Sequence, residues 1–289
     1  MSKTIAWIIT GVAVVALGAG AMWIQRPQGT PVAPPAVATA SPTLPAPASA
    51  AAPVPATSPG VTSAAIQAVD GAAAKQRYAI ITFYRSKDAA SDTMRAAVKA
   101  QRARITSRAD LVEVDRDNPA NEALITRFGL AQAPTPITLV VAPNGAVTAG
   151  FPTELKPEVK LAKTFVSTGL ANVLKTLQSG KMAVVCLQNG RTTLNKQTQA
   201  LAKEIAADPR LAGQAASLTM DPADRAEVDF YTQCKVPKGA RKAQLLLLVP
   251  PGTVVGVFDG DTAKDAVMAK IQSACSGGSC GPSGCAPAP

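Results

Sequence analysis

The sequence predicts an α/β protein in which two similar domains follow an apolar N-terminal segment and a proline-rich linker. Three observations lead to this prediction. Strand-like apolar runs alternate with stretches of helical spacing, their order occurs twice after residue 75, and the first 74 residues differ in composition from the rest. The chain has 289 residues, which is enough for about two domains at roughly 150 residues each.

Residues 1–26 contain an uncharged apolar stretch, residues 5–24, between Lys3 and Arg26. As a helix this stretch would be about 30 Å long, which is the hydrocarbon thickness of a bilayer, and a tryptophan lies near each end. We expect a retained membrane anchor; the alternative is a signal peptide cleaved near the small residues 19–21. Either way, the domains are expected on the periplasmic or extracellular side of a membrane.

Residues 27–74 are expected to form a disordered Pro/Ala-rich linker. Its first 34 residues contain ten prolines and no charged side chain. Prolines at this density favour extended polyproline II geometry, at about 3.1 Å per residue, so the linker could reach roughly 100 Å.

Residues 75–178 form the first expected domain. Apolar β-rich runs at residues 78–84, 111–115, 136–142 and 146–151 predict strands, and helical spacing predicts helices near residues 90–98, 119–128 and 157–178. Asn144-Gly145 indicates a hairpin turn, and Gly129 a helix C-terminus.

Residues 179–274 form the second expected domain because they repeat this order. Strands are expected at residues 182–187, 216–221, 244–249 and 253–258, with helices at residues 197–205, 227–236 and 261–274. Residues 275–289 remain as a Cys/Gly-rich tail.

The segment VEVDRDNPANEALITRFGLAQAPTPITLVVAPNGAVTAGF, residues 112–151, resembles the thioredoxin stretch that runs from the central strand to the terminal hairpin. The resemblance implies two tandem thioredoxin-like domains, each with a mixed central sheet flanked by helices. It also implies a cis-proline at Pro134, in the Ala133-Pro134-Thr135 loop. In the second domain Arg241 falls near that position, and no proline replaces it.

The resemblance places the redox slot of the first domain at residues 88–91, where Asp88 and Ser91 take the positions of the two cysteines. The second slot, residues 192–195, also lacks cysteine. Thiolate chemistry needs sulfur, and the chain has no C-x-x-C and no histidine, which excludes Ser-His-Asp and Cys-His catalysis. The sequence therefore favours a non-catalytic protein and indicates no catalytic or cofactor-binding residue.

The five cysteines fall into two groups. Cys186 and Cys234 lie in apolar stretches and are expected to be buried thiols, with a disulfide between them as the alternative. Cys275, Cys280 and Cys285 in the tail are candidate ligands for a soft metal ion such as Cu(I) or Zn(II). The alternatives for the tail are a disulfide or redox pair, an intermolecular disulfide, or no chemical role.

The net charge is +10, of which +6 lies in residues 75–175. Two basic clusters stand out: Lys99, Arg102, Arg104 and Arg108, and Lys235, Lys238, Arg241 and Lys242. They suit anionic lipid or acidic protein, or are simply solvated faces; export and the lack of interleaved aromatics disfavour nucleic acid.

These observations together favour a membrane-anchored, extracytoplasmic, non-catalytic protein that binds a partner or supports assembly in the cell envelope. The alternative function is soft-metal binding or thiol-disulfide exchange by the tail.

Overall fold

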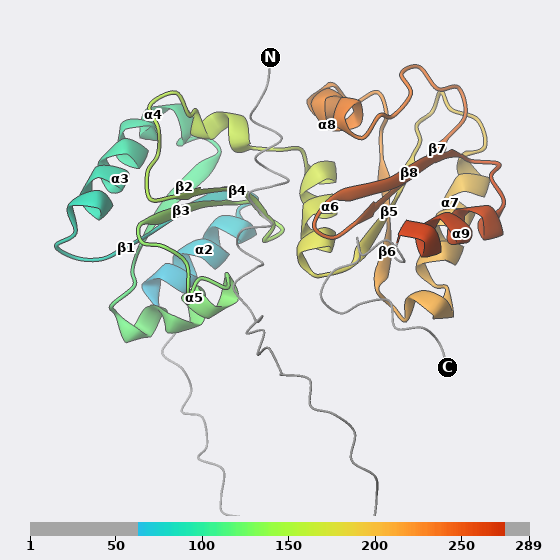
Figure 1. Ribbon diagram of the computed structural model, residues 1–289. Coiled ribbons are helices and arrows are strands. Elements are labelled where there is room, and N and C mark those ends of the chain that lie inside the picture. Colours follow the sequence, from blue (N-terminus) through green and yellow to red (C-terminus); the bar gives the residue numbers. More distant parts are fainter. Residues whose placement is uncertain (1–62, 275–289) are drawn as a thin grey trace, which may run out of the picture.

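The computed structural model describes residues 63–274, which form two α/β domains, each built on its own four-stranded sheet (Figure 1). The first sheet has the order β2-β1-β3-β4 and contains β1 Tyr78–Tyr84, β2 Ala109–Asp115, β3 Ile137–Val141 and β4 Val147–Pro152. The second has the order β6-β5-β7-β8 and contains β5 Met182–Leu187, β6 Ala215–Met220, β7 Gln244–Val249 and β8 Thr253–Asp259. In each sheet the first two strands in sequence pair in parallel and the other pairings are antiparallel. The predicted α/β class and the repeat are confirmed.

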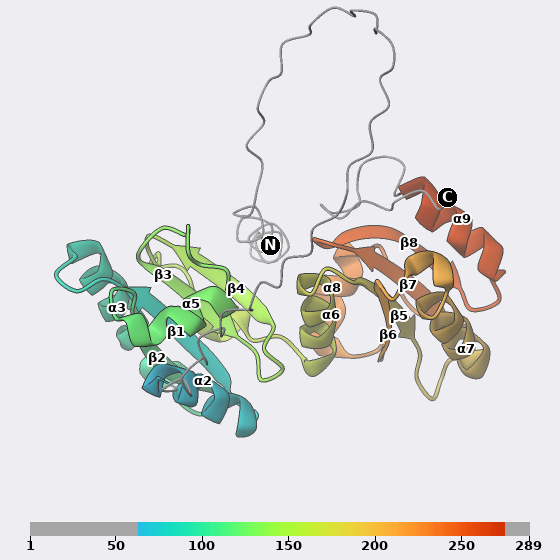
Figure 2. The same cartoon turned by 90° about the horizontal axis from the view of Figure 1, so that it is seen from below.

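Helices pack on both faces of each sheet. The first domain contains α2 Ala64–Ala74, α3 Ala89–Ala100, α4 Arg102–Ile105, α5 Glu122–Arg127, and the 3-10 turns η1 Pro119–Asn121 and η2 Leu161–Thr164. The second contains α6 Thr168–Gln178, α7 Asn195–Ala206, α8 Val228–Gln233, α9 Lys264–Ala274, η3 Pro209–Leu211 and η4 Arg225–Glu227. In the second domain α7 and α9 share one core, and α6 and α8 share the other. Figure 2 shows the two pairs of helices on opposite sides of the second sheet.

Helix α2 lies where the sequence analysis expected linker, so the expected disorder of residues 64–74 is wrong. Ser63 caps the helix, because its side chain accepts a hydrogen bond from the N–H of Ile66 at 3.2 Å. The segment is rich in alanine, the best helix former, and it buries Val69 and Ala72 against the sheet. An alanine-rich segment is compatible with both a linker and a helix, and only its packing against the sheet decides between them.

Helix α6 is shorter than predicted, since it begins at Thr168 rather than near Pro157. Ser167 caps it by accepting the N–H of Leu170 at 3.1 Å. The preceding residues cover the sheet of the first domain without forming a long helix, and Leu155 and Leu161 are buried there. The predicted apolar spacing holds only in part, because Val159 and Val166 are half-buried in this irregular segment whereas Ala162 is exposed.

Both cores use α6. Ala171 and Leu174 belong to a core of the first domain, whereas Val173 and Leu177 belong to a core of the second. Figure 1 shows α6 between the two sheets. The predicted domain limits at residues 178 and 179 therefore meet at the end of a helix that both domains bury.

The turn residues are as expected, but the cis-proline is not. Gly145 has φ +82° in the β3–β4 turn, and Gly129 has φ +64° after α5. The cis bond of the first domain is Thr135–Pro136, so the prediction of Pro134 is wrong by two residues. Both positions are X-Pro bonds, and only the start of β3 at Ile137 shows which proline adjoins the strand.

Several predictions fall outside the described residues: the anchor in residues 1–26, the linker up to residue 62, and the tail cysteines. Within residues 63–274, no helix combines the length and the apolar character that crossing a membrane requires.

Candidate functional site

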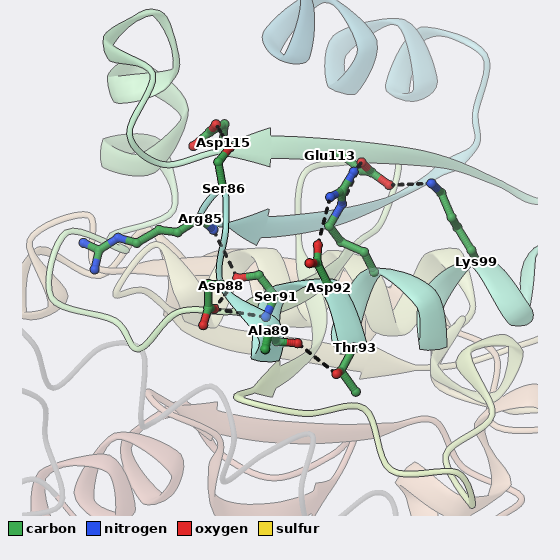
Figure 3. Close-up of polar contacts among 11 residues, drawn as sticks. Arg85, Ser86, Asp88, Ala89, Ser91, Asp92, Thr93, Lys99, Glu113 and Asp115 are labelled. Carbon is green, nitrogen blue, oxygen red and sulfur yellow. Dashed lines mark hydrogen bonds and ion pairs between the residues drawn. The ribbon is translucent and has the colours of Figure 1, made fainter.

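Asp88 and Ser91 form the start of α3, at the position where the resemblance places a dithiol (Figure 3). Asp88 is the N-cap residue, and its Oδ2 accepts the N–H of Ser91 at 3.0 Å and the Ser91 hydroxyl at 2.6 Å. Ser91 is fully buried, and its Oγ also accepts the N–H of Arg85 at 3.1 Å. The hydrogen bonds from Ser91, together with a smaller effect of the Arg85 charge, lower the pKa of Asp88. A carboxylate and a hydroxyl thus bond to each other where thiol chemistry needs two sulfurs.

Charged side chains of both signs surround this helix start. Ser86 donates its hydroxyl to Asp115 Oδ2 at 2.8 Å, and Arg85 lies 3.3 Å from Asp117 (Figure 3 shows the first pair). Lys87 is exposed and has a left-handed backbone, with φ +64°. This edge is therefore a polar, solvent-facing surface.

Arg116 holds the loop that precedes β3. Its guanidinium donates to four groups of that loop: Leu130 O at 2.6 Å, Ala131 O at 3.3 Å, Ala133 O at 2.8 Å and Thr135 Oγ1 at 2.7 Å. Burial is the main cause that lowers the pKa of Arg116, and the nearby Arg85 adds to it. Because Phe83 pairs with Ile137, this loop lies beside the end of β1, from which the α3 start follows. We call Arg85–Asp88 and the loop 131–136 together the α3-end surface, because they lie at the N-terminal end of α3.

Sequence reasoning missed Arg116. Its carbonyl partners are backbone groups that leave no mark on the sequence. The one available signal was that the repeat has Pro222 where the first domain has Arg116, directly after Asp221 and Asp115 respectively.

The corresponding surface of the second domain is closed by backbone pairing. The N–H of Thr193 donates to Arg241 O at 2.8 Å, and the N–H of Ala243 donates to Thr193 O at 2.9 Å. Lys242, which lies between Arg241 and Ala243, forms an ion pair with Asp261 after β8 at 2.7 Å. In the first domain, no backbone hydrogen bond joins residues 86–90 to the loop 131–136 in the described chain.

Cys186 and Cys234 are buried free thiols, as expected, and the alternative of a disulfide between them is wrong. They lie in cores on opposite faces of the second sheet. Burial raises the pKa of Cys186 to about 11 and of Cys234 to about 12, so neither is a thiolate near neutral pH.

The candidate metal ligands Cys275, Cys280 and Cys285 lie outside the described residues. Within residues 63–274, no group of three or more His, Cys, Asp or Glu side chains has the arrangement of a metal site.

Each basic cluster contains one lysine in an ion pair: Lys99 in the first and Lys242 in the second. Lys99 lies 3.6 Å from Glu113, which also binds Arg95, and Arg108 lies over the Phe165 ring at 5.0 Å. Arg102 and Arg104 are exposed and have no ion pair within the described chain.

Glu227 is a further residue that sequence reasoning missed. It is 1% exposed, at the end of η4, and burial raises its pKa to about 7. The equivalent residue of the first domain, at the end of η1, is Asn121, whose amide donates to Asp115 O at 2.9 Å. Nothing in the local sequence distinguishes this glutamate from an exposed one.

No protein-family model matches the chain, and no curated protein matches it either. Solved structures do match. Human ERp44, form II, is 14% identical with a TM-score of 0.31, over 72% of this chain and 55% of that one. The first two thioredoxin domains of Eps1p from Naumovozyma dairenensis are 11% identical with a TM-score of 0.25, over 70% of this chain and 93% of that one. The N-terminal NTD_N/C domain of alkylhydroperoxide reductase AhpF from Enterococcus faecalis is 13% identical with a TM-score of 0.22, over 70% and 95%. The chain spans about half the length of ERp44.

The order of the strands and the placement of the helices define the fold of each domain. Each sheet places two parallel strands beside an antiparallel hairpin, with helices on both faces. Both domains therefore have the mixed central sheet, flanked by helices, that the resemblance to thioredoxin implies.

Proposed function

We propose that this chain is a membrane-anchored, extracytoplasmic protein that binds a protein partner of the cell envelope through its α3-end surface, without dithiol exchange. One observation carries the proposal: this surface is free of backbone pairing in the first domain, whereas its counterpart in the second is closed by Thr193. A free surface beside a loop held by Arg116 suits binding, because its geometry is set before the partner arrives.

The chemistry of the helix start supports binding rather than exchange. The Asp88 carboxylate accepts both the hydroxyl and the N–H of Ser91, so neither a reactive sulfur nor an unpaired base lies there. Arg85, Lys87 and Asp117 are exposed and of mixed sign, which suits a polar peptide segment with charges of both signs.

The membrane part of the proposal rests on the sequence of residues 5–24 and on the linker behind it. A proline-rich spacer with a reach of roughly 100 Å would let the domains meet a partner away from the bilayer.

An insulin-reduction assay tests the absence of exchange chemistry. We expect the full-length protein to reduce insulin no faster than the reductant alone. D88C/S91C, which installs Cys-Ala-Ala-Cys at the N-cap and third helical positions, should gain measurable turnover and so show that the assay works on this scaffold. Wild-type turnover near that of the double variant, retained in C275S/C280S/C285S, contradicts the proposal.

Site-specific photo-crosslinking tests the binding surface. A photoreactive residue in place of Lys87 should give a protein adduct in intact cells, and the same residue in place of Arg191 on the closed surface should not. R116A should lose the adduct because it releases the loop, whereas K270A, an exposed change on α9, should keep it. Equal adducts at residues 87 and 191 contradict the proposal.

A second candidate function is chemistry of the tail, favoured by the Cys-x4-Cys-x4-Cys spacing of Cys275, Cys280 and Cys285. Three thiolates suit Cu(I) or Zn(II), or thiol-disulfide exchange with another protein, including an intermolecular disulfide. Stoichiometric Cu(I) or Zn(II) binding by the reduced full-length protein, lost in C275S/C280S/C285S, would support it.

A further inference from the structure

Glu227 is a carboxylic acid buried at the joint between the two domains. Its Oε1 accepts the N–H of Leu170 in α6 at 3.2 Å, a donor that it shares with Ser167 Oγ. Its Oε2 has no hydrogen-bond partner in the described chain. One oxygen of this carboxyl is therefore bonded, and the other is buried without a partner.

Gly169 allows the start of α6 to approach this carboxyl closely. A Cβ at residue 169 would lie 3.2 Å from the Cε atom of Met220 and 3.5 Å from Glu227 Oε1. The first contact is tighter than ordinary van der Waals packing. The helix end thus rests directly on the end of β6 and on η4 because residue 169 has no side chain.

The same short segment is held from the first domain. The Tyr78 hydroxyl donates to Val166 O at 2.7 Å, and the Tyr78 ring stacks on Phe165 with centroids 4.5 Å apart. Residues 165–170 therefore contact Tyr78, a buried residue of the first domain, and Glu227, a buried residue of the second. Because both cores include α6, a change at this joint reaches both domains.

We propose that Glu227 makes a pH-sensitive contact, which holds residues 225–233 against the start of α6 when the carboxyl is protonated and loosens when it ionises. An ionised carboxylate needs hydrogen-bond donors to both oxygens, and here Oε2 would be charged, buried and unbonded. The N-terminus of α6 favours a negative charge, but it donates only the N–H of Leu170 to Glu227. If η4 and α8 move away from α6, water can reach Oε2, and the free-energy cost of the buried charge is removed.

The surrounding titratable groups do not neutralise the charge. In η4, Asp224 repels it; in α8, the Tyr231 hydroxyl donates to Asp221 O at 2.7 Å instead. The first domain presents Tyr78, whose hydroxyl is bonded to Val166, and residues 168–174 of α6 carry no charge. Burial raises the pKa of Glu227 to about 7, the Leu170 N–H opposes this rise, and Asp224 adds to it. The change of charge therefore falls near neutral pH.

Hydrogen exchange of the full-length protein in detergent, from pH 5 to pH 8.5, tests the proposal after correction for intrinsic exchange rates. The opening equilibrium constant for amides 228–234 should rise by on the order of 100-fold, with a midpoint near pH 7. Amides of α7, which is remote from the joint, should not change. E227Q should remove the transition, since glutamine keeps the shape without the titration.

Two further variants keep the test decisive if E227Q folds poorly. D224N retains the η4 cap but removes the repelling charge, so its midpoint should move to lower pH. G169A should raise opening at every pH without removing the transition, because it disturbs the packing alone. A flat wild-type profile, a transition that persists in E227Q, or an unmoved midpoint in D224N would overturn the proposal.

Discussion

The two domains have the same fold, but they treat the start of their first long helix differently. In the second domain Thr193 forms a backbone bridge to the segment before β7, and the surface is closed. In the first domain the Arg116 guanidinium forms hydrogen bonds to the corresponding loop, and the α3-end surface has no such backbone pairing among the described residues. The two surfaces thus differ by two backbone hydrogen bonds, which are present in the second domain and absent from the described residues of the first.

The difference extends to the joint. The first domain has Asn121 at the end of its 3-10 turn, bonded within its own loop, and the second has Glu227, which reaches the shared helix α6. The second domain therefore contributes a structural connection, while the first contributes the exposed surface.

The largest effect is expected from breaking the shared helix. L174A removes a buried side chain from the core of the first domain and should cost about 4 kcal/mol of unfolding free energy. V173A, its neighbour in the core of the second domain, should cost about 2 kcal/mol. Native-state hydrogen exchange should show that either change weakens both sheets, because α6 is common to them. Weakening confined to one sheet would mean that the domains are independent.

The next effect concerns pH and separates Glu227 from Asn121. The pKa of Glu227 is raised from 4.5 to about 7, so its stabilising contribution is complete below pH 4.5 and is lost as pH rises through 7. The loss should be about 3 kcal/mol, measured as the difference in urea-unfolding free energy between wild type and E227Q at pH 5 and pH 8. N121D, the matched change in the first domain, would place a carboxyl in the equivalent position and should create a similar dependence. An equal slope in wild type and E227Q would contradict this assignment.

A smaller effect is expected at the α3 cap. D88A removes the acceptor for the Ser91 N–H and hydroxyl and should destabilise the first domain by about 1 kcal/mol. D88N, which can still cap the helix, should recover most of the loss. Thermal unfolding of the three proteins checks the order, and a neutral D88A would show that the cap is not needed.

The smallest effect should have the opposite sign at the start of α7. Leu194 is the N-cap residue there, with φ +64° and no side-chain cap bond. Asparagine tolerates this backbone and offers a cap oxygen, so L194N should stabilise the second domain by about 0.5 kcal/mol. L194V, which suits the left-handed region poorly, should destabilise it, and calorimetry at one pH distinguishes the two.

Much of the fold could be predicted because it is written in local patterns. The strands at Tyr78–Tyr84 and Met182–Leu187 match their apolar runs residue for residue, and Gly145 lies in its turn. Helix α2 was missed because its alanines gain their value only from the sheet that Val69 covers. The cis-proline was misplaced because two neighbouring prolines satisfy the same pattern.

The candidate site divides in the same way. Asp88 and Ser91 could be found from the sequence, because the resemblance to thioredoxin places them at the start of the helix that follows β1. Arg116 and Glu227 could not, since the backbone groups that they bind, such as Leu130 O and the Leu170 N–H, lie 14 and 57 residues away along the chain.

The sequence by itself determined the α/β repeat, the positions of the strands, the absence of histidine and of a C-x-x-C, and the polar residues in the redox slot. Three features depended on the tertiary structure. The surface beside the second redox slot is closed by backbone pairing, α6 packs in a core of each domain, and Glu227 is buried beside α6. The reason is physical: strands and turns follow from the chemistry of neighbouring residues, whereas burial and long-range backbone pairing depend on what the rest of the chain brings to the same place.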